Sequence, residues 1–224
     1  MSGHALVLGD GDAPDRAGLD GAWPGWDEGI ALVVAADGGA RLAASLGVAI
    51  DRWVGDADSY PRSEVDVLAA TGVAVRIVPT AKDESDLELA VLEAVALGTD
   101  RITVLGALGG PRLDHELANV ALLAHPALAG IDVELLDERT RARLLTGPAS
   151  ASLAGRTGDV VSLLPLGDVV EGITTTGLGY PLAEEPLRLG PARGLSNVRT
   201  DERATIAIRE GRLLVVETPA TVGS

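Results

Sequence analysis

One repeated pattern most constrains the fold: an apolar run, a polar turn rich in Gly and Asp, and then a helix pattern, recurring through the first 125 residues. The apolar runs are short and bounded by turn residues, which is typical of strands buried on both faces. Helix patterns end at glycines such as Gly47 and Gly98, as expected of helix termini. Strands alternating with helices predict an α/β fold, with a parallel sheet and right-handed crossovers.

The bounds of the expected elements follow from this alternation. We expect strands at the apolar runs, which are residues 4–8, 30–36, 50–54, 74–78 and 101–105. We expect helices at residues 40–46, 61–70 and 86–97, and one that follows the loop at 106–115 and ends near residue 124.

The sequence changes character after Asp132, where the remaining apolar runs are short and punctuated by Gly and Pro, without a helical period. Strands are expected at residues 133–136, 141–145, 159–164, 169–175, 205–209 and 212–217. Gly211 separates the last two and predicts a β-hairpin. We therefore predict two domains, an α/β domain over residues 1–146 and a small all-β domain over residues 147–224.

The turn after the third expected strand, residues 55–59, places Asp56 and Asp58 one residue apart. Paired carboxylates at the end of a strand suit Mg²⁺, which takes oxygen ligands and keeps open positions for substrate phosphates. The plainer interpretation is that Asp56 shapes a turn and Ser59 caps the next helix.

Two other turns carry residues suited to phosphate. Gly38 and Gly39 would let backbone N–H groups approach an anion at a helix N-terminus. Lys82 is the only lysine among 18 basic residues, which suggests a specific contact. Ser85, three residues before Glu88, has the spacing of a helix capping box. The turn at residues 9–12 is either a ligand-approach point or a plain surface turn.

The loop at residues 106–115 joins several glycines to Arg112, Asp114 and His115 at the start of a helix. Asn119 follows His115 by one turn, on the same face of that helix. Asp114 could simply cap the helix, and His115 could be an ordinary surface residue.

Acidic residues from these turns are expected to meet, because the turns after parallel strands lie at one edge of the sheet, where ligands bind. Several carboxylates at one place repel each other unless a cation lies between them. The pattern therefore predicts a Mg²⁺ site to which these residues converge: Asp37, Asp56, Asp58, Asp86 and Asp114.

The charge balance argues against a nucleic-acid binder, since 33 acidic and 18 basic residues give a formal net charge of −15. There is no cysteine, so disulfides and thiolate metal sites are excluded. The first residues lack a signal-peptide pattern, and no apolar stretch approaches the ~18 residues of a membrane span. We expect a soluble, cytoplasmic protein with no membrane or nucleic-acid partner.

Taken in order, the motifs resemble those of the thiamine pyrophosphokinase family. The matching segments are residues 37–40, 55–59, 82–86, 109–119, 174–178 and 194–197. The resemblance implies an α/β catalytic domain followed by a β-sandwich-like, thiamine-binding domain, assembled as a homodimer. It also implies transfer of a pyrophosphoryl group from ATP to the hydroxyl of thiamine, releasing AMP, with Mg²⁺. Because every candidate phosphate or metal residue lies before residue 120 and the thiamine candidates lie in the all-β part, we expect sites shared between the two subunits.

The same resemblance, together with the turn chemistry above, suggests a role for each candidate residue. The expected metal ligands are Asp56, Asp58 and Asp86. The expected catalytic residues are Asp37, Asp56, Asp58, Lys82, Asp86 and Asp114. The expected nucleotide-binding residues are Gly38, Gly39, Ser85, Gly109, Gly110, Arg112, His115 and Asn119. The expected thiamine-binding residues are Tyr180, Ser196 and Asn197.

The chain departs from the family pattern at a few positions. Pro111 is an extra residue in the glycine loop, and Ala57 replaces an aromatic residue often found between the two aspartates. Tyr180 stands where some relatives have Trp, which keeps an aromatic face for a cationic ring. Two alternative functions remain open: a pyrophosphokinase for another alcohol, such as a hydroxymethylpterin, and a non-catalytic nucleotide- or thiamine-binding regulator.

Overall fold

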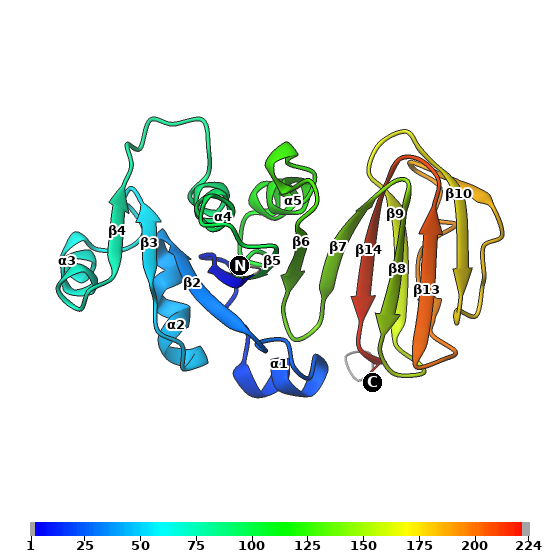
Figure 1. Cartoon of the computed structure of the whole chain (residues 1–224), viewed down its shortest axis with the longest axis horizontal. Helices are drawn as coiled ribbons and strands as arrows, with labels where there is room; N and C mark the ends of the chain where they lie inside the picture. Colours follow the sequence, from blue (N-terminus) through cyan, green and yellow to red (C-terminus); the bar gives the residue numbers. More distant parts are fainter. Residues whose placement is uncertain (1–2, 221–224) are drawn as a thin grey trace. The chain divides into compact units, whose positions relative to one another are not determined.

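A computed structural model describes residues 3–220 and divides the chain into two compact units, Met1–Glu138 and Arg139–Ser224 (Figure 1). The first is α/β and the second is all-β, so the predicted fold class is confirmed. The division falls earlier in the chain than the predicted boundary at 146/147. The reason is that β7 (Arg141–Thr146) pairs with β14 (Arg212–Thr218), so both strands belong to the second unit.

The first unit is built on a parallel sheet whose strand order is β6-β5-β1-β2-β3-β4. The strands are β1 (His4–Leu8), β2 (Ile30–Ala36), β3 (Arg52–Gly55), β4 (Ala74–Ile77), β5 (Arg101–Leu105) and β6 (Asp132–Leu136). The chain runs outward from β1 to β4 and then returns to place β5 on the other side of β1. A crevice opens at such a switch point, between the turns that follow the two strands, and ligands bind there in open α/β sheets.

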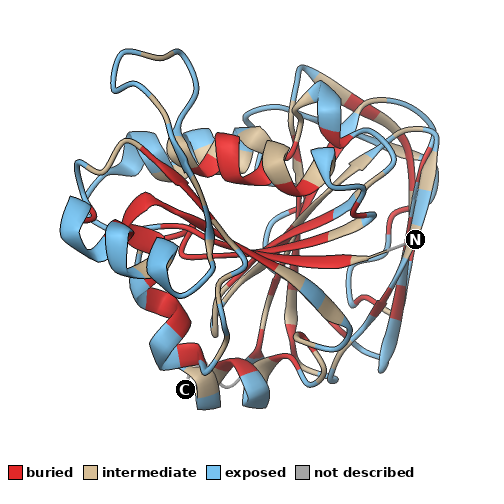
Figure 2. Ribbon diagram, turned by 60° about the vertical axis from the view of Figure 1, so that its left-hand side comes forward, coloured by how far each residue is buried: buried red, intermediate tan, exposed pale blue. Residues whose placement is uncertain are grey.

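Within residues 3–220, five α-helices cover this sheet: α1 (Arg16–Ala22), α2 (Ala40–Leu46), α3 (Arg62–Ala70), α4 (Asp86–Ala96) and α5 (Leu113–Leu122). Side chains such as Leu19 of α1, Leu42 of α2 and Val65 of α3 share one core with Leu6 and Trp53 of the sheet. Helices α4 and α5 lie on the opposite face (Figure 1). Figure 2 shows that the strands are largely buried, while exposed residues lie mostly on the outer sides of helices and in loops.

Helix α5 differs from the other helices because none of its residues is buried. Leu113 and Leu117, one turn apart, are 67% and 60% exposed. The helix that carries the glycine loop therefore presents an apolar face with no partner among residues 3–220.

The second unit is a sandwich of two antiparallel sheets. One has the strand order β12 (Asn197–Val198), β9 (Val160–Pro165), β14 and β7, and the other has the order β11 (Glu185–Arg188), β10 (Val169–Thr176), β13 (Arg203–Ile208) and β8 (Ala149–Ala154). Buried side chains from both sheets, such as Leu163, Ile173 and Ile206, form a single core.

The hairpin predicted around Gly211 is wrong. Strand β13 pairs with β10 and β8, whereas β14 pairs with β7 and β9, so the two strands belong to different sheets. Gly211 has φ +96°, and a Cβ there would lie 2.7 Å from the carbonyl oxygen of Val169. The glycine makes a close turn that carries the chain from one sheet to the other, rather than a turn between paired neighbours.

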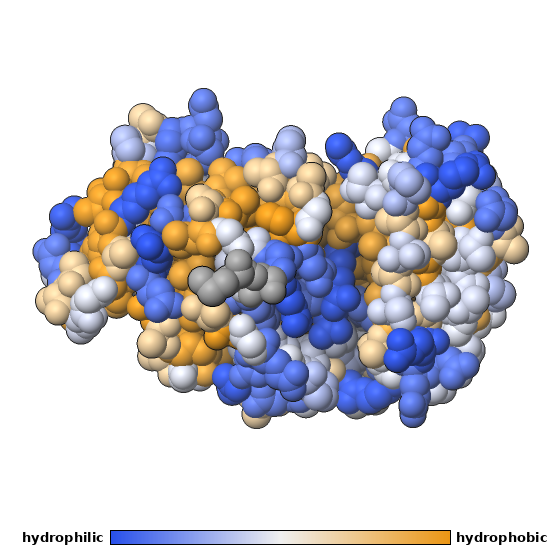
Figure 3. All heavy atoms as spheres, in the orientation of Figure 1, coloured by the Kyte–Doolittle hydropathy of each residue, from blue (hydrophilic) through white to orange (hydrophobic). Residues whose placement is uncertain are grey.

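The described part of the chain, residues 3–220, contains no helix with the length and apolarity to cross a membrane. On the face that Figure 3 shows, hydrophilic residues are spread over both units rather than gathered on one of them.

Candidate active site

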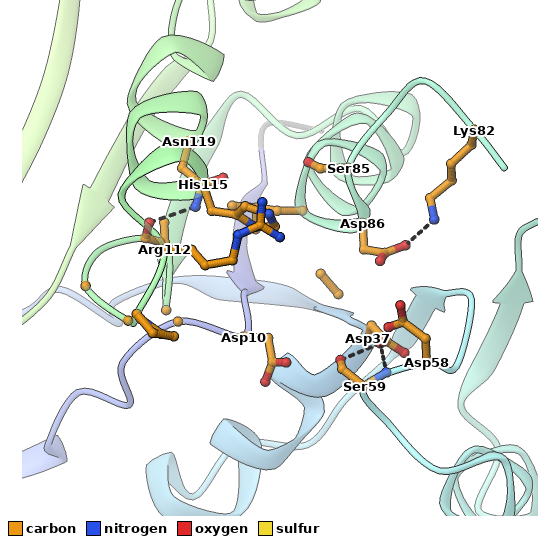
Figure 4. Close-up of a pocket in the computed structure, with 18 residues that line it drawn as sticks. Asp10, Asp37, Asp58, Ser59, Lys82, Ser85, Asp86, Arg112, His115 and Asn119 are labelled. Atoms are coloured by element: carbon orange, nitrogen blue, oxygen red, sulfur yellow. Dashed lines mark hydrogen bonds and ion pairs between the residues drawn. The ribbon is translucent and has the colours of Figure 1, made fainter. Parts of the chain in front are cut away.

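A cleft of about 390 Å³ lies in the first unit at the carboxyl ends of the strands (Figure 4). Its walls come from the turns that follow β1, β2, β3, β4 and β5, as expected for the switch point of this sheet. It brings together many of the predicted site residues, namely Asp37, Asp58, Lys82, Ser85, Asp86, Gly109, Gly110, Arg112, His115 and Asn119.

Three carboxylates form the tightest acidic group beside this cleft. One oxygen from each of Asp37, Asp56 and Asp58 lies within 4.8 Å of the others. Asp37 is 3% exposed, and its Oδ1 has no hydrogen-bond partner among the described residues. An unpartnered buried carboxylate oxygen is costly unless a cation neutralises it. Carboxylate oxygens are also the donors that Mg²⁺ prefers, so the group fits that ion.

The pKa shifts in this group reflect its crowding. Burial raises the pKa of the Asp58 carboxyl, and the negative charges of Asp56 and Asp37 raise it further. Burial also acts to raise the pKa of Asp56, but hydrogen bonds from Lys82 and from the Asp58 backbone outweigh it and lower that pKa. Asp56 is therefore held ionised, whereas Asp58 lacks a compensating cation among residues 3–220.

Lys82 is the side chain that links Asp86 to this group. Its Nζ lies 3.1 Å from Asp56 Oδ2 and 3.1 Å from Asp86 Oδ1. Burial would lower the pKa of Lys82, but the hydrogen bonds with Asp56 and Asp86 outweigh this and raise it, so the amine stays charged. Asp86 has a pKa raised by burial, despite its contact with Lys82. The tightest carboxylate group thus contains Asp56 and Asp58, as predicted for the metal ligands, but its third member is Asp37 rather than the predicted Asp86.

The glycine loop forms the opposite wall, where Arg112 and His115 face Asp37 and Asp58 across the cleft (Figure 4). Arg112 Nε donates to Asp114 Oδ1 at 3.2 Å, and this hydrogen bond lowers the pKa of the Asp114 carboxyl. Asp114 lies in the first turn of α5, is exposed, and does not line the cleft.

Two polar side chains shape the walls through their contacts with the backbone. Asn119 Nδ2 donates to the carbonyl of Ala107 at 2.8 Å, which ties the glycine loop to α5. Ser85 Oγ accepts the backbone N–H of Glu88 at 3.1 Å and caps α4, as the capping-box spacing predicts. Ser85 also lines the cleft.

Asp10 and Gly11, which follow β1, also line the cleft, although the sequence left their turn open between a ligand-approach point and a plain surface turn. The signal was present, since a Gly-rich polar turn after the first strand is a common ligand-approach point. Asp10 forms an ion pair with Arg41 at 3.5 Å, and the Arg41 guanidinium lies over the Tyr60 ring at 5.2 Å.

In the second unit, the three predicted thiamine residues lie on two segments, which are joined by hydrogen bonds between Asn197 and Tyr180. Asn197 is buried, and its side-chain amide hydrogen-bonds to the backbone. Its Oδ1 accepts the N–H groups of Tyr180 and Val198, and its Nδ2 donates to the Tyr180 carbonyl at 2.7 Å. Tyr180 as a whole is 68% exposed. Ser196 has φ +55° and donates its N–H to Ser162 Oγ. Asn197 thus holds the backbone of the residue that presents an aromatic face.

Comparison with known families matches both units. The family pattern described as "Thiamin pyrophosphokinase, catalytic domain" matches residues 26–135. The pattern described as "Thiamin pyrophosphokinase, vitamin B1 binding domain" matches residues 151–213.

Individual relatives cover nearly all of the chain. A Bacillus subtilis protein named thiamine pyrophosphokinase is 26% identical over 192 residues, which are 86% of this chain and 89% of that protein. A solved structure of thiamine pyrophosphokinase from Bacillus subtilis has a TM-score of 0.82 at 26% identity and covers 97% of this chain and 99% of that one. A solved thiamin pyrophosphokinase from Geobacillus thermodenitrificans has a TM-score of 0.79 at 26% identity, with 96% and 97% covered.

Proposed function

The chain belongs to the thiamin pyrophosphokinase family, and from this premise we propose that it transfers a pyrophosphoryl group from ATP to the hydroxyl of thiamine, giving thiamine diphosphate and AMP. The observation that carries the proposal is the cleft at the switch point, which sets a carboxylate group opposite a glycine loop in a chain whose two units both match this family.

Mg²⁺ is the expected cofactor, with Asp37, Asp56 and Asp58 as the residues best placed to hold it. When bound, such an ion would stabilise the negative charge of the phosphate oxygens during transfer. Asp86, which is joined to Asp56 through Lys82, remains a further predicted ligand.

The chain's own cations and backbone dipoles complete the phosphate site in this proposal. Pyrophosphoryl transfer depends mainly on positioning and on neutralising charge. Lys82 and Arg112 supply positive charge on two sides of the cleft. Gly109 and Gly110, with φ +73° and +85°, let the loop backbone take a conformation closed to most side chains, so N–H groups can approach a phosphate.

A carboxylate would orient the thiamine hydroxyl, and the geometry favours the acidic group of Asp37, Asp56 and Asp58 over Asp114. Asp114 is exposed and hydrogen-bonded to Arg112, which lowers its pKa and weakens it as a base. The acidic group of Asp37, Asp56 and Asp58 instead reaches the cleft wall, through Asp37 and Asp58. Asp114 acts in this scheme through its hold on Arg112.

Thiamine selection is assigned to the second unit, at Tyr180, Ser196 and Asn197. The cationic thiazolium ring would stack on Tyr180, whose position Asn197 maintains through the backbone.

We also propose a homodimer with shared sites, and the unpartnered Leu113 and Leu117 on α5 support it, because exposed apolar patches often mark interfaces. A cytoplasmic location stays a prediction.

The deciding experiment is incubation of the protein with Mg²⁺, ATP and thiamine, followed by chromatography of the products. We expect AMP and thiamine diphosphate in equal amounts. Formation of ADP and thiamine monophosphate would show a different transfer, and a preference for a hydroxymethylpterin over thiamine would show a different substrate. Binding of both ligands without turnover would support a regulator instead.

A further inference from the structure

Ser59 makes an unusual set of hydrogen bonds between two turns of the cleft. Its backbone N–H donates to Asp37 Oδ2 at 2.9 Å, and its hydroxyl donates to the same oxygen. The hydroxyl oxygen in turn accepts the backbone N–H of Gly38 at 3.2 Å. The turn after β3 is thereby tied to the turn after β2, and Figure 4 shows Ser59 beside Asp37 and Asp58.

The backbone of Asp37 is held as firmly as its side chain. The residue has φ +40°, which is rare for a residue other than glycine. Its carbonyl accepts the indole N–H of Trp53, a fully buried side chain, at 3.0 Å. Gly55 leaves room for it, since a Cβ at that position would lie 2.8 Å from Asp37 Cβ. Strain at a site held on several sides is a mark of function.

The two oxygens of Asp37 are consequently not equivalent. Oδ2 accepts both donors of Ser59, whereas Oδ1 has no hydrogen-bond partner among residues 3–220. The residue is 3% exposed, so water does not compensate Oδ1 freely. In protein metal sites, ligating carboxylates are commonly fixed by hydrogen bonds from outer residues, which leave the remaining oxygen for the ion.

We propose that Ser59 is a positioning residue that makes Asp37 a one-oxygen ligand of the metal ion at this cleft. The inference rests on the proposed function only in assuming a divalent cation beside Asp37, Asp56 and Asp58. Ser59 saturates one oxygen and directs the other toward the acidic group. Metal affinity is then set in part by a hydroxyl that never touches the ion.

The test is titration of the nucleotide-free protein with Mn²⁺, a spectroscopic substitute for Mg²⁺, followed by electron paramagnetic resonance. Ser59→Ala should weaken Mn²⁺ binding about tenfold, which is the lower end of the effects typical for residues that hydrogen-bond to a metal ligand. Ser59→Thr keeps the hydroxyl and should bind nearly as the parent does. Ser45→Ala is the matched control, because Ser45 lies in α2 outside the cleft and donates to the Leu42 carbonyl. It should leave Mn²⁺ binding unchanged.

A kinetic readout separates positioning from general damage. In Ser59→Ala the Mg²⁺ concentration for half-maximal rate should rise, and saturating Mg²⁺ should restore most of kcat. If Ser59→Ala does not fold, Ser59→Cys carries the same test, because it keeps the size and has only a weak donor.

Two results would overturn the proposal: Ser59→Ala binding Mn²⁺ like the parent, or Asp37→Asn doing so. The titration contains neither ATP nor thiamine, so it is independent of the product assay. A parent that makes no thiamine diphosphate but shows the expected Mn²⁺ series would refute the function and leave this inference standing.

Discussion

The two walls of the cleft differ in how deeply their residues are buried and in the contacts that hold them in place. The carboxylate wall, after β2 and β3, is tied together by Ser59 and Trp53, and Asp37 is almost fully buried within it. The glycine-loop wall, after β5, consists largely of exposed residues, and its helix α5 buries no side chain. Arg112 and Asp114 pair with each other near the surface.

The difference suggests that one wall is rigid before a ligand binds and that the other adapts to the ligand. Buried, hydrogen-bonded groups keep their geometry without a ligand, as a metal site requires. Exposed segments with few buried contacts open at low free energy and adapt to what binds them. We infer that the carboxylate wall is preorganised for the ion, while the glycine loop is completed by the nucleotide. The following predictions test that contrast, from the largest expected effect to the smallest.

The largest effect is expected from neutralising the carboxylate wall. Asp56→Asn or Asp58→Asn should reduce kcat at least a hundredfold, since one preorganised contact to transition-state charge contributes ~3 kcal/mol. The melting temperature of Asp58→Asn should stay close to that of the parent, because this exposed side chain lies in a turn. Asp56→Asn also weakens the buried contact with Lys82 and should melt at a lower temperature than the parent. Asp83→Asn, a change in the exposed loop before α4, is the control and should be silent. Parental turnover by both Asp56→Asn and Asp58→Asn would contradict the assignment of these residues as metal ligands.

Lys82→Met should have the next largest effect. Charged hydrogen bonds contribute ~1.5–3 kcal/mol, so loss of the amine should lower kcat/KM roughly ten- to a hundredfold. It also leaves Asp56 and Asp86 without their shared cation, so the metal-free variant should melt at a lower temperature than the parent. Added Mg²⁺ should recover much of that loss in a thermal scan. A variant with parental kinetics would make Lys82 a purely structural residue.

Asn197→Ala should affect one substrate only. Loss of its hydrogen bonds to the Tyr180 backbone, at ~0.5–1.5 kcal/mol each, should raise the KM for thiamine several-fold and leave the KM for ATP nearly unchanged. The measurement is a pair of saturation curves. An equal rise in both KM values would mean that the change disturbs the whole chain rather than thiamine binding.

Mixing an Asp56→Asn chain with an Asn197→Ala chain tests the shared site directly. If each site uses residues of two subunits, one site of the mixed dimer carries both changes and the other carries neither, so the active site of the mixed dimer should show the parent's KM for thiamine. If each site belongs to one chain, the active site carries Asn197→Ala, and the mixed dimer should show the raised KM of that variant.

The smallest effect is expected on the glycine-loop wall. Asp114→Asn should leave the melting temperature unchanged and alter kcat by less than about threefold, because exposed ion pairs contribute little. A loss comparable to that of Asp58→Asn would show that this wall is as preorganised as the other, and would make Asp114 the residue that orients the hydroxyl.

Local pattern alone predicted most of the fold. The strands at residues 4–8, 30–36 and 101–105 have the predicted bounds, and α2 ends at Gly47 as expected. These features depend on apolar runs and turn residues that lie next to each other in the chain. The convergence of Asp37, Asp58 and Asp86 on one cleft followed from a general rule, since the turns after parallel strands share an edge.

Tertiary structure decided what depends on contacts between distant segments. The hairpin prediction at Gly211 failed because sheet membership is set by pairing with β7, β9 and β10, which no local signal encodes. The tight grouping of Asp37 with Asp56 and Asp58 is held by hydrogen bonds to Asp37 from Trp53, in β3, and from Ser59, in the turn after β3.

Sequence by itself thus determined which residue types stand at the edge of the sheet, since hydrophobic period and turn chemistry are local properties. Only the tertiary structure decided which oxygen of Asp37 is free, and that Lys82 lies between Asp56 and Asp86. The reason is physical: the partners of a buried polar group are chosen by the packing of segments 20 or more residues apart in the sequence, as for Asp37 and Ser59.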